Sequence, residues 1–440
     1  MTKKNITRIS GPISRITCLL FFAFFFHGSK LLAQEKPTAS QQDSIDQTKQ
    51  IDIFDVIRKW RGKPFKPVIT IPQPYVKNIS LLPIVGYSPA NGFVLGAAIS
   101  STSYLGDPKK TRLSSALINA SFTTKAQILL NLRFDLFLKE NKWYMSGDNR
   151  LLFFSQPTYG LGIYGLQGQP YTFNISGSSV TKIVTDQPMR FNYIRLYDNF
   201  MRRISGQWYA GIGPMFDIDF NIKDEYLQDS GTSAHYRYSR IYGFDTLHYS
   251  ANGFAFSLMQ DTRDNPVNAY KGSYIYVAYR FNAVALGSSK ASDMFYYDLR
   301  KYIGVKSSVP RDVLAFWLWG TFQASGTLPY LTLPAITWDT YNRSGRGYIQ
   351  GRFRGTNMMY GEMEYRFRLS QNGLFGGVVF LNGTTASNPL TDQKVLNAIA
   401  PGYGFGLRIM MNKNDRTNIC VDYGMGDGFA GIYFNIRETF

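Results

Sequence analysis

The chain has 440 residues, a formal net charge of +18 and an aromatic fraction of 16%, with 30 Tyr and 33 Phe. Cys420 is the only cysteine after Cys18, which lies in the amino-terminal apolar run, so a disulfide framework is excluded. Basic charge often indicates nucleic acid as a partner, but no cluster of Lys and Arg with interleaved aromatic residues appears here. We therefore expect no nucleic-acid partner.

Residues 1–33 have the pattern of a secretory signal peptide. Basic residues without any acid precede an apolar run from Ile16 to Phe26, and Leu31-Leu32-Ala33 follow. The run is shorter than the roughly 20 residues that a membrane-spanning helix needs. We expect cleavage after Ala33, and export of a basic chain whose simplest anionic partner is outer-membrane lipid or lipopolysaccharide.

Residues 34–79 are polar and rich in proline, acidic at first and basic afterwards, which predicts a periplasmic linker. Within this linker Ile53, Phe54, Ile57 and Trp60 share one face at helical spacing, so a short amphipathic helix is predicted. Such a helix would lie on the inner membrane surface or plug a lumen, or form only transiently in a mobile tail.

Residues 80–440 predict a transmembrane antiparallel β-barrel, an all-β fold of about 16 strands, each of about 10 alternating residues. The expected strands start near Gly92, Arg112, Ala126, Lys142, Thr158, Gln187, Gln207, Asn252, Gly272, Asp293, Asp312, Asn357, Leu374, Gly402, Arg416 and Phe429. An even strand number places both ends of the barrel in the periplasm and the long connections outside the cell. Those long connections are residues 167–186, 220–250, 324–356 and 384–400.

The last strand carries the clearest membrane pattern. Its residues alternate, so that one row is apolar except at Glu438 and the other row is polar or small. The apolar row is Ala430, Ile432, Phe434, Ile436, Glu438 and Phe440. This pattern favours a barrel strand facing lipid over the edge strand of a soluble sandwich. It predicts an integral multi-pass barrel in the outer membrane of a Gram-negative bacterium.

Three segments resemble motifs of one protein family. The first is the turn Asp261-Thr262-Arg263-Asp264-Asn265-Pro266, which Gly272 closes before a strand. The second is Arg346-Gly347-Tyr348, between the eleventh and twelfth expected strands. The third is the terminal strand, with Gly431, Ile432, Phe434, Ile436 and Phe440 in the pattern of a barrel-assembly signal. Together they resemble the BamA/TamA superfamily of outer-membrane proteins, the bacterial surface antigens, over about residues 80–440.

The resemblance implies that the loop around Arg346 folds into the lumen and that this arginine pairs with the barrel wall. The family's usual wall partner is an acid in an F-x-D segment, and the matching place here reads Phe380-Leu381-Asn382. Asn382 would accept a hydrogen bond without supplying charge, which implies a weaker clamp or another acid, with Glu362 and Glu364 as candidates. Gly345 also departs from the aliphatic residue of the family motif.

Family members typically carry periplasmic POTRA domains, and residues 34–79 are too few for one. Pro83-Ile84-Val85-Gly86, expected just before the first strand, more weakly resembles other surface-antigen barrels. We therefore expect no POTRA domain that could bind substrate polypeptides, which places any role in catching polypeptides in the periplasm in doubt.

No enzyme signature appears. His235 and His248 are expected to be surface residues rather than metal ligands with Asp245, and no G-x-S-x-G elbow or phosphate-binding loop occurs at a strand-to-helix junction. We expect no catalytic residues, no metal and no cofactor.

Three functions remain open from the sequence. The resemblance favours a barrel that assists insertion of outer-membrane proteins, with nascent barrels or assembly components as partners, through a weak seam between residues 92–102 and 429–440. The alternative is a passive or gated channel whose basic lumen favours anions. An outer-membrane lipase or protease is the third.

Overall fold

The computed structural model describes a barrel and the segment that leads into it. It covers residues 50–65, 74–88, 91–166, 169–175, 178–184, 186–225, 233–306 and 309–440. The predicted signal peptide, residues 1–33, and the first part of the predicted linker lie outside the described residues.

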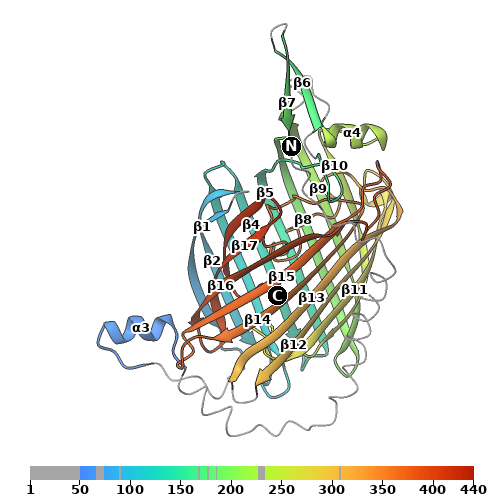
Figure 1. Ribbon diagram of the computed structural model, residues 1–440. Coiled ribbons are helices and arrows are strands. Elements are labelled where there is room, and N and C mark those ends of the chain that lie inside the picture. Colours follow the sequence, from blue (N-terminus) through green and yellow to red (C-terminus); the bar gives the residue numbers. More distant parts are fainter. Residues whose placement is uncertain are drawn as a thin grey trace.

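The described residues form a sixteen-stranded sheet in which every neighbouring pair is antiparallel and follows chain order, and the sheet curves into a barrel (Figure 1). Its strands are β1 (Asn78–Ser88), β2 (Gly92–Tyr104), β3 (Leu113–Thr123), β4 (Ile128–Leu138), β5 (Trp143–Ser155), β8 (Met189–Ser205), β9 (Trp208–Asp224), β10 (Tyr249–Asp261), β11 (Gly272–Asn282), β12 (Ser292–Lys306), β13 (Val309–Gly326), β14 (Asn357–Arg368), β15 (Phe375–Ala386), β16 (Ala400–Asn412), β17 (Thr417–Gly426) and β18 (Phe429–Ile436). The predicted all-β fold class and the strand number are confirmed.

Few other elements are present in the described part of the chain. They are the hairpin of β6 (Gln169–Ile175) and β7 (Ser178–Val184), the helices α3 (Ile53–Trp60) and α4 (Ala234–Ile241), and the 3₁₀ turn η2 (Val284–Leu286). Among the described residues, no helix has the length and apolar character needed to cross a membrane.

The two ends of the barrel differ. We call the end at which β1 begins and β18 finishes the turn end, and the opposite end the loop end. The β6–β7 hairpin and α4 lie at the loop end, with the long connection between β13 and β14. Connections at the turn end are short, as the strand pattern predicts.

The strands expose apolar side chains outward and bury charged ones inward. In β2, Phe93, Leu95 and Ile99 are exposed, whereas Ala98 and Ser100 are buried. Exposed apolar side chains of the same kind lie on strands all around the sheet: Val85, Phe122, Leu130, Leu196, Phe256, Met363, Leu381, Phe405 and Phe434. Buried charged side chains line the interior: Arg133, Asp148, Arg150, Asp217, Arg280, Asp298, Glu362, Glu364, Arg366, Arg408 and Asp422. This inside-out distribution suits a bilayer outside and a polar lumen.

Two predicted elements are wrong, and the errors cancel in the strand count. Residues 78–88, expected to precede the first strand, form β1. Pro83 lies within it, and proline is tolerated there because β1 is an edge strand with hydrogen bonds to only one neighbour. The barrel therefore begins at Asn78.

The strand expected near Thr158 does not exist. Thr158 makes a single bridge to Gln187, and Gly160, Gly162 and Gly165 then have φ values of +84°, +77° and +59°. Three left-handed residues within six positions interrupt the extended backbone that a strand needs. This segment instead approaches the lumenal loop, because the Gly162 N–H donates to the carbonyl of Arg354.

Candidate functional site

The connection between β13 and β14, residues 327–356, folds back into the barrel. The Arg354 guanidinium donates to the carbonyl oxygens of Leu331 and Leu333 within this connection. On the wall, Arg150 of β5 donates to Asn342 and to the carbonyl oxygen of Asp339. We call residues 327–356 the lumenal loop. Its place between the eleventh and twelfth strands is the one that the sequence predicts.

Arg346 lies at the centre of a buried cluster of carboxylates. Its side chain is almost fully buried, and its guanidinium pairs with Glu362 at 2.6 Å, with Asp422 at 2.8 Å and with Glu364. Its Cζ also lies 3.6 Å from the ring centroid of Phe380. Glu362 and Glu364, the candidates from the sequence, are therefore partners, and Asp422 on β17 is one that sequence reasoning missed. The pattern that could have found it is an inward acid on a strand near the end of the chain.

Asn382 is in the clamp, but not in the predicted role. Its amide donates to the carbonyl oxygen of Arg346 at 2.9 Å and to Glu362 at 3.4 Å. It does not accept from the guanidinium: the acids bond to the two Nη atoms of Arg346, and among the described residues neither the Arg346 Nε nor the Asn382 Oδ1 has a hydrogen-bond partner. Of the two expected alternatives, a weaker clamp or another acid, the structure has the second: Glu362 and Glu364 pair with Arg346, and the Asn382 amide bonds to the loop backbone.

Glycines let the lumenal loop come within contact of the wall. Gly347 has φ +105°, and a Cβ there would lie 2.5 Å from the carbonyl oxygen of Met425. On the wall, a Cβ at Gly424 would lie 2.6 Å from the Gly347 nitrogen. Gly345, which departs from the aliphatic family residue, has φ +77° and would clash with Ile336. Its conformation requires glycine.

Tyrosines complete the contact between the lumenal loop and the last strands. The Tyr348 hydroxyl donates to the carbonyl of Pro401 at 2.6 Å and accepts from the Asp427 N–H at 3.1 Å. The Tyr433 hydroxyl accepts from the Gly347 N–H at 3.0 Å and donates to the carbonyl of Tyr348 at 2.9 Å. The predicted motif Arg346-Gly347-Tyr348 is therefore brought together with β14, β16, β17 and β18.

Beyond β18 the chain turns into the lumen. Ala430, Ile432 and Phe434 are exposed as predicted, but Arg437 has φ +74° and the alternation stops there. We call residues 437–440 the terminal segment, and all four of its residues are buried. The prediction that Glu438 and Phe440 continue the outer row is therefore wrong.

The terminal segment is held by charges and by aromatic packing. The Glu438 carboxylate accepts from Arg408 and Asn418, each at 2.7 Å. The ring of Phe440 stacks on Trp317 with centroids 5.3 Å apart, and its carbonyl oxygen accepts from Arg366 at 3.0 Å. A buried carboxylate with these partners is stable inside, whereas in lipid it would be costly. This explains why Glu438 breaks the apolar row.

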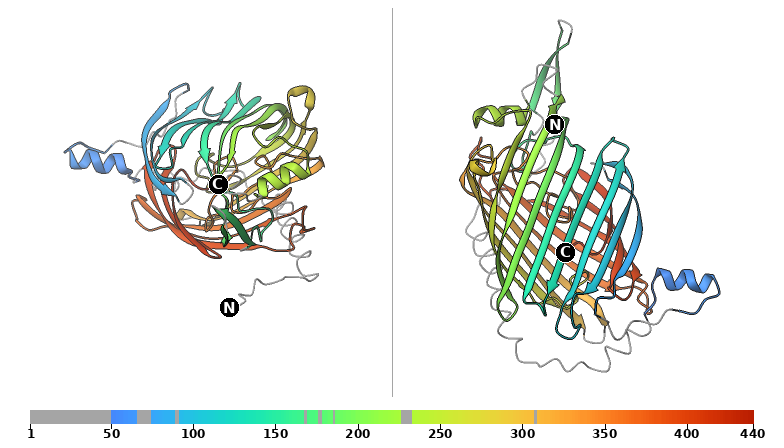
Figure 2. Two further views of the ribbon diagram at one scale, coloured as in Figure 1. Left: turned by 90° about the horizontal axis from the view of Figure 1, so that it is seen from above. Right: turned by 180° about the vertical axis from the view of Figure 1, so that it is seen from behind.

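The sheet has two edges that face each other. Within the described residues β1 pairs only with β2, and β18 pairs only with β17, although β1 and β18 lie side by side (Figure 2). The Phe434 side chain lies against Gly86, because a Cβ added at Gly86 would be 3.6 Å from the Cβ of Phe434. One hydrogen bond crosses from the terminal segment past β1, from Arg437 to Ser100 of β2 at 2.8 Å. We call this β1–β18 junction the seam, and it replaces the predicted seam at residues 92–102.

The predicted inner turn connects β10 and β11 at the turn end. Asp261 accepts from the Arg263 side chain, and Asp264 accepts from the backbone N–H of Tyr270 and the side chain of Arg416. Asn265 accepts from two backbone N–H groups of its own turn and donates to the carbonyl of Asp415. The turn thereby reaches across the barrel base to the β16–β17 turn.

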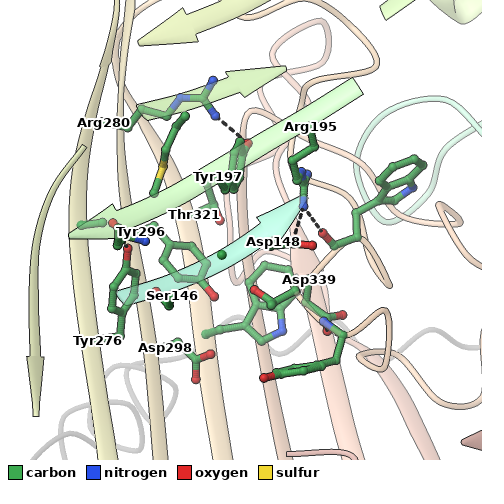
Figure 3. A pocket seen from close by; sticks show the side chains of 18 of the residues that line it. Ser146, Asp148, Arg195, Tyr197, Tyr276, Arg280, Tyr296, Asp298, Thr321 and Asp339 are labelled. Carbon is green, nitrogen blue, oxygen red and sulfur yellow. Dashed lines mark hydrogen bonds and ion pairs between the residues drawn. The ribbon is translucent and has the colours of Figure 1, made fainter. Parts of the chain in front are cut away.

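A cavity of about 230 Å³ remains inside the barrel beside the lumenal loop. Figure 3 shows Arg195 directed at Asp148, and Arg280 directed at Tyr197, across this space. Its charged lining residues are Arg195, Arg263, Arg280, Arg300, Asp135, Asp148, Asp298 and Asp339. Because four arginines face four aspartates, this cavity is balanced in charge, and the expectation of a basic lumen is wrong here.

The histidines do not form a metal site with other ligands in the described part of the chain. His248 is exposed and 3.3 Å from Asp245, as a surface residue would be. His235, expected at the surface, is instead fully buried on α4, 3.3 Å from Asp224. No group of three His, Cys, Asp or Glu side chains among the described residues is placed to hold a metal ion.

The inside-out barrel, the loop clamped in its lumen and the open seam define a class of outer-membrane β-barrels. The family model of the Omp85 superfamily domain matches residues 216–440, and the chain belongs to this superfamily. It is thus an outer-membrane β-barrel of the Omp85 superfamily. A comparison with curated protein sequences gives no match.

Solved structures of the same fold include BamA from Haemophilus ducreyi lacking POTRA domains 1–3. It is 12% identical, with a TM-score of 0.52 over 82% of this chain and 70% of that one. CdiB from Acinetobacter baumannii is 12% identical over 82% of this chain and 59% of its own, with a TM-score of 0.47. CdiB from Escherichia coli is 9% identical over 84% and 62%, with a TM-score of 0.49. At these identities the likeness concerns the fold.

Proposed function

We propose that this barrel assists the insertion or assembly of outer-membrane proteins, alone or as an accessory of an assembly complex. The observation that carries the proposal is the seam, where two strand edges lie side by side without a shared hydrogen-bond ladder among the described residues. Unpaired backbone N–H and C=O groups at a strand edge are a template for an incoming strand.

The lumenal loop and terminal segment support the C-terminal side of this seam. Arg343 of the lumenal loop donates to the carbonyl oxygens of Ile436 and Glu438, and Tyr433 of β18 bonds to the loop backbone. β18 is therefore braced from inside the barrel. β1 is held by its ladder with β2 and by Ile84, which packs, as Ile436 does, against the cluster of Ala98, Leu117 and Met411. We infer that β1 moves away while β18 stays in place.

The superfamily membership and the BamA fold likeness favour a role in protein insertion. Its test is a folding assay in proteoliposomes. Vesicles that contain the barrel should accelerate the folding of a small outer-membrane barrel diluted from urea, relative to empty vesicles of the same lipid. Equal rates in both vesicles would contradict the proposal.

A gated channel is the second candidate, and the lumenal cavity favours it. The lumenal loop and terminal segment occupy much of the interior, so conduction would require their displacement. In planar bilayers we expect little conductance from the native chain. A steady conductance in the native chain, together with no effect on folding in the vesicle assay, would favour the channel.

A further inference from the structure

Helix α3 leaves the barrel with its apolar face uncovered. On its helical wheel Ile53, Val56, Ile57 and Trp60 share one side, and Asp55 lies opposite. Trp60 is 85% exposed, and Phe54, Val56 and Ile57 are also exposed. Figure 1 and both views of Figure 2 show α3 extending away from the wall beside the turn ends of β16 and β17. The helix therefore does not plug the lumen.

The charged side and the beginning of α3, rather than its apolar side, are fastened to the protein. Asp52 caps the helix and accepts from the Lys413 N–H at 3.2 Å, and Asp55 pairs with the Lys413 ammonium. One residue earlier, the Ile51 N–H donates to the carbonyl of Asn372 at 3.1 Å. These bonds join the start of the helix to the β14–β15 and β16–β17 turns, and so fix the position of the helix at the turn end of the barrel.

A helix that packs on a protein normally buries its apolar stripe, and α3 does the reverse. The wall above it is apolar as well, because Phe375 at the start of β15 and Leu407 of β16 are exposed. The apolar face of α3 therefore lies near the border of the apolar band of the barrel. Three basic residues flank the apolar face: Arg58 on the helix, and Arg61 and Lys63 directly after it. An apolar face with flanking positive charge fits an interface of acyl chains and anionic headgroups.

We propose that α3 is an interfacial anchor that binds the inner leaflet of the outer membrane, with its apolar side chains at the acyl boundary and its basic residues at anionic phospholipid headgroups. It pins the turn ends of β15–β17, next to the seam, to the lipid surface. The proposal goes beyond the insertion role and does not depend on it.

The test uses the full chain in nanodiscs of phosphatidylcholine, with or without phosphatidylglycerol. An environment-sensitive fluorophore is attached to Ile57→Cys on the apolar face or, as the matched control, to Lys59→Cys on the opposite face. The parent chain, whose Cys420 is buried, reports background labelling. We expect acyl-chain nitroxide lipids to quench the label at residue 57 severalfold more than the label at residue 59, and aqueous iodide to show the reverse order.

At low salt, phosphatidylglycerol should increase the depth of the label at residue 57 in the bilayer, and high salt should reverse that change. Equal iodide quenching at the two positions would overturn the proposal. So would protection of residue 57 that disappears on dilution, since that would indicate a second copy on the helix. Heat-modifiable migration in gel electrophoresis confirms a folded barrel in each sample, so a null result cannot be attributed to misfolding.

Discussion

Arg346 shows how one side chain can help to hold a loop of about thirty residues inside a lumen. Loops of this length are uncommon and usually functional. Three carboxylates from β14 and β17 share one guanidinium, which supplies five donors in a planar fork. Glu364 also pairs with Arg366, and Asp422 with Arg408, whereas the ion pair recorded for Glu362 in the described part of the chain is with Arg346. Removing one member of such a group leaves uncompensated buried charge, which is more costly than the net value of the pair.

We expect Arg346→Met to destabilise the folded barrel by about 3–5 kcal/mol and to expose the lumenal loop. The matched control is Arg352→Met, because Arg352 stacks on Tyr159 and Phe353 and has no recorded ion pair among the described residues. Limited proteolysis measures the exposure of the loop, and the temperature at which the folded gel band disappears measures the stability of the barrel. Equal behaviour of the two variants would contradict the clamp.

Asn382→Asp should weaken the barrel rather than restore the family pattern. The new carboxylate would face the Arg346 carbonyl and Glu362, and it would lose a donor hydrogen bond, at a cost of about 1–3 kcal/mol. Asn382→Ala removes the donor without adding charge and should cost less. The temperature at which the folded gel band disappears compares the stability of the two variants. A neutral or stabilising effect of Asn382→Asp would refute the role of the Asn382 amide as a donor to the loop.

At the scale of elements, the terminal segment shows the limit of alternation as a guide. The period-2 pattern predicts the faces of residues 430–434 correctly, because β18 is paired with β17 there. The pattern fails at Arg437, where the backbone is left-handed and the strand has ended. The alternation of apolar and polar residues does not indicate this end. The charge of Glu438 was the available signal, since a carboxylate facing lipid is improbable.

Ser100→Ala should loosen the seam. It removes the acceptor of the Arg437 hydrogen bond without altering the strained backbone at residue 437, and such a bond to a charged group contributes about 1.5–3 kcal/mol. Hydrogen exchange of β1 and β18 should accelerate, whereas Ser101→Ala, which points to the other face, should leave it unchanged. Unchanged exchange in Ser100→Ala would show that this bond does not hold the seam.

Gly272→Ala should damage the β10–β11 turn. Gly272 has φ +107°, and its Cβ would lie 2.3 Å from the Thr262 carbonyl oxygen. Gly428→Ala is a matched control, since φ is also positive at +70° but nothing lies within 4 Å. We expect the control to lower the free energy of unfolding by about 1–2 kcal/mol, from backbone strain alone, and Gly272→Ala to lower it further. Thermal unfolding in detergent compares them, and equal losses would contradict a steric role.

For the whole molecule, the sequence predicts architecture better than contacts. Alternating strands and short turns are local signals, and they locate fifteen of the sixteen strands of the sheet. The predicted count of sixteen is right because the strand wrongly expected near Thr158 offsets the missed β1. The edge strand β1, with Pro83, lacks that signal. Partners such as Asp422 and Arg437 come from distant parts of the chain, and only the folded barrel brings them to Arg346 and Ser100.

If client strands insert at the seam, the seam must open, and a disulfide across it would prevent that opening. The Cβ separation at Gly86 and Phe434 matches the typical value of about 3.8 Å for a disulfide. The double variant Gly86→Cys with Phe434→Cys, in proteoliposomes, should lose its acceleration of client-barrel folding when oxidised and regain it on reduction. Each single variant should remain active throughout. Full activity in the oxidised double variant, with the disulfide verified by mass spectrometry, would show that the barrel works without opening the seam.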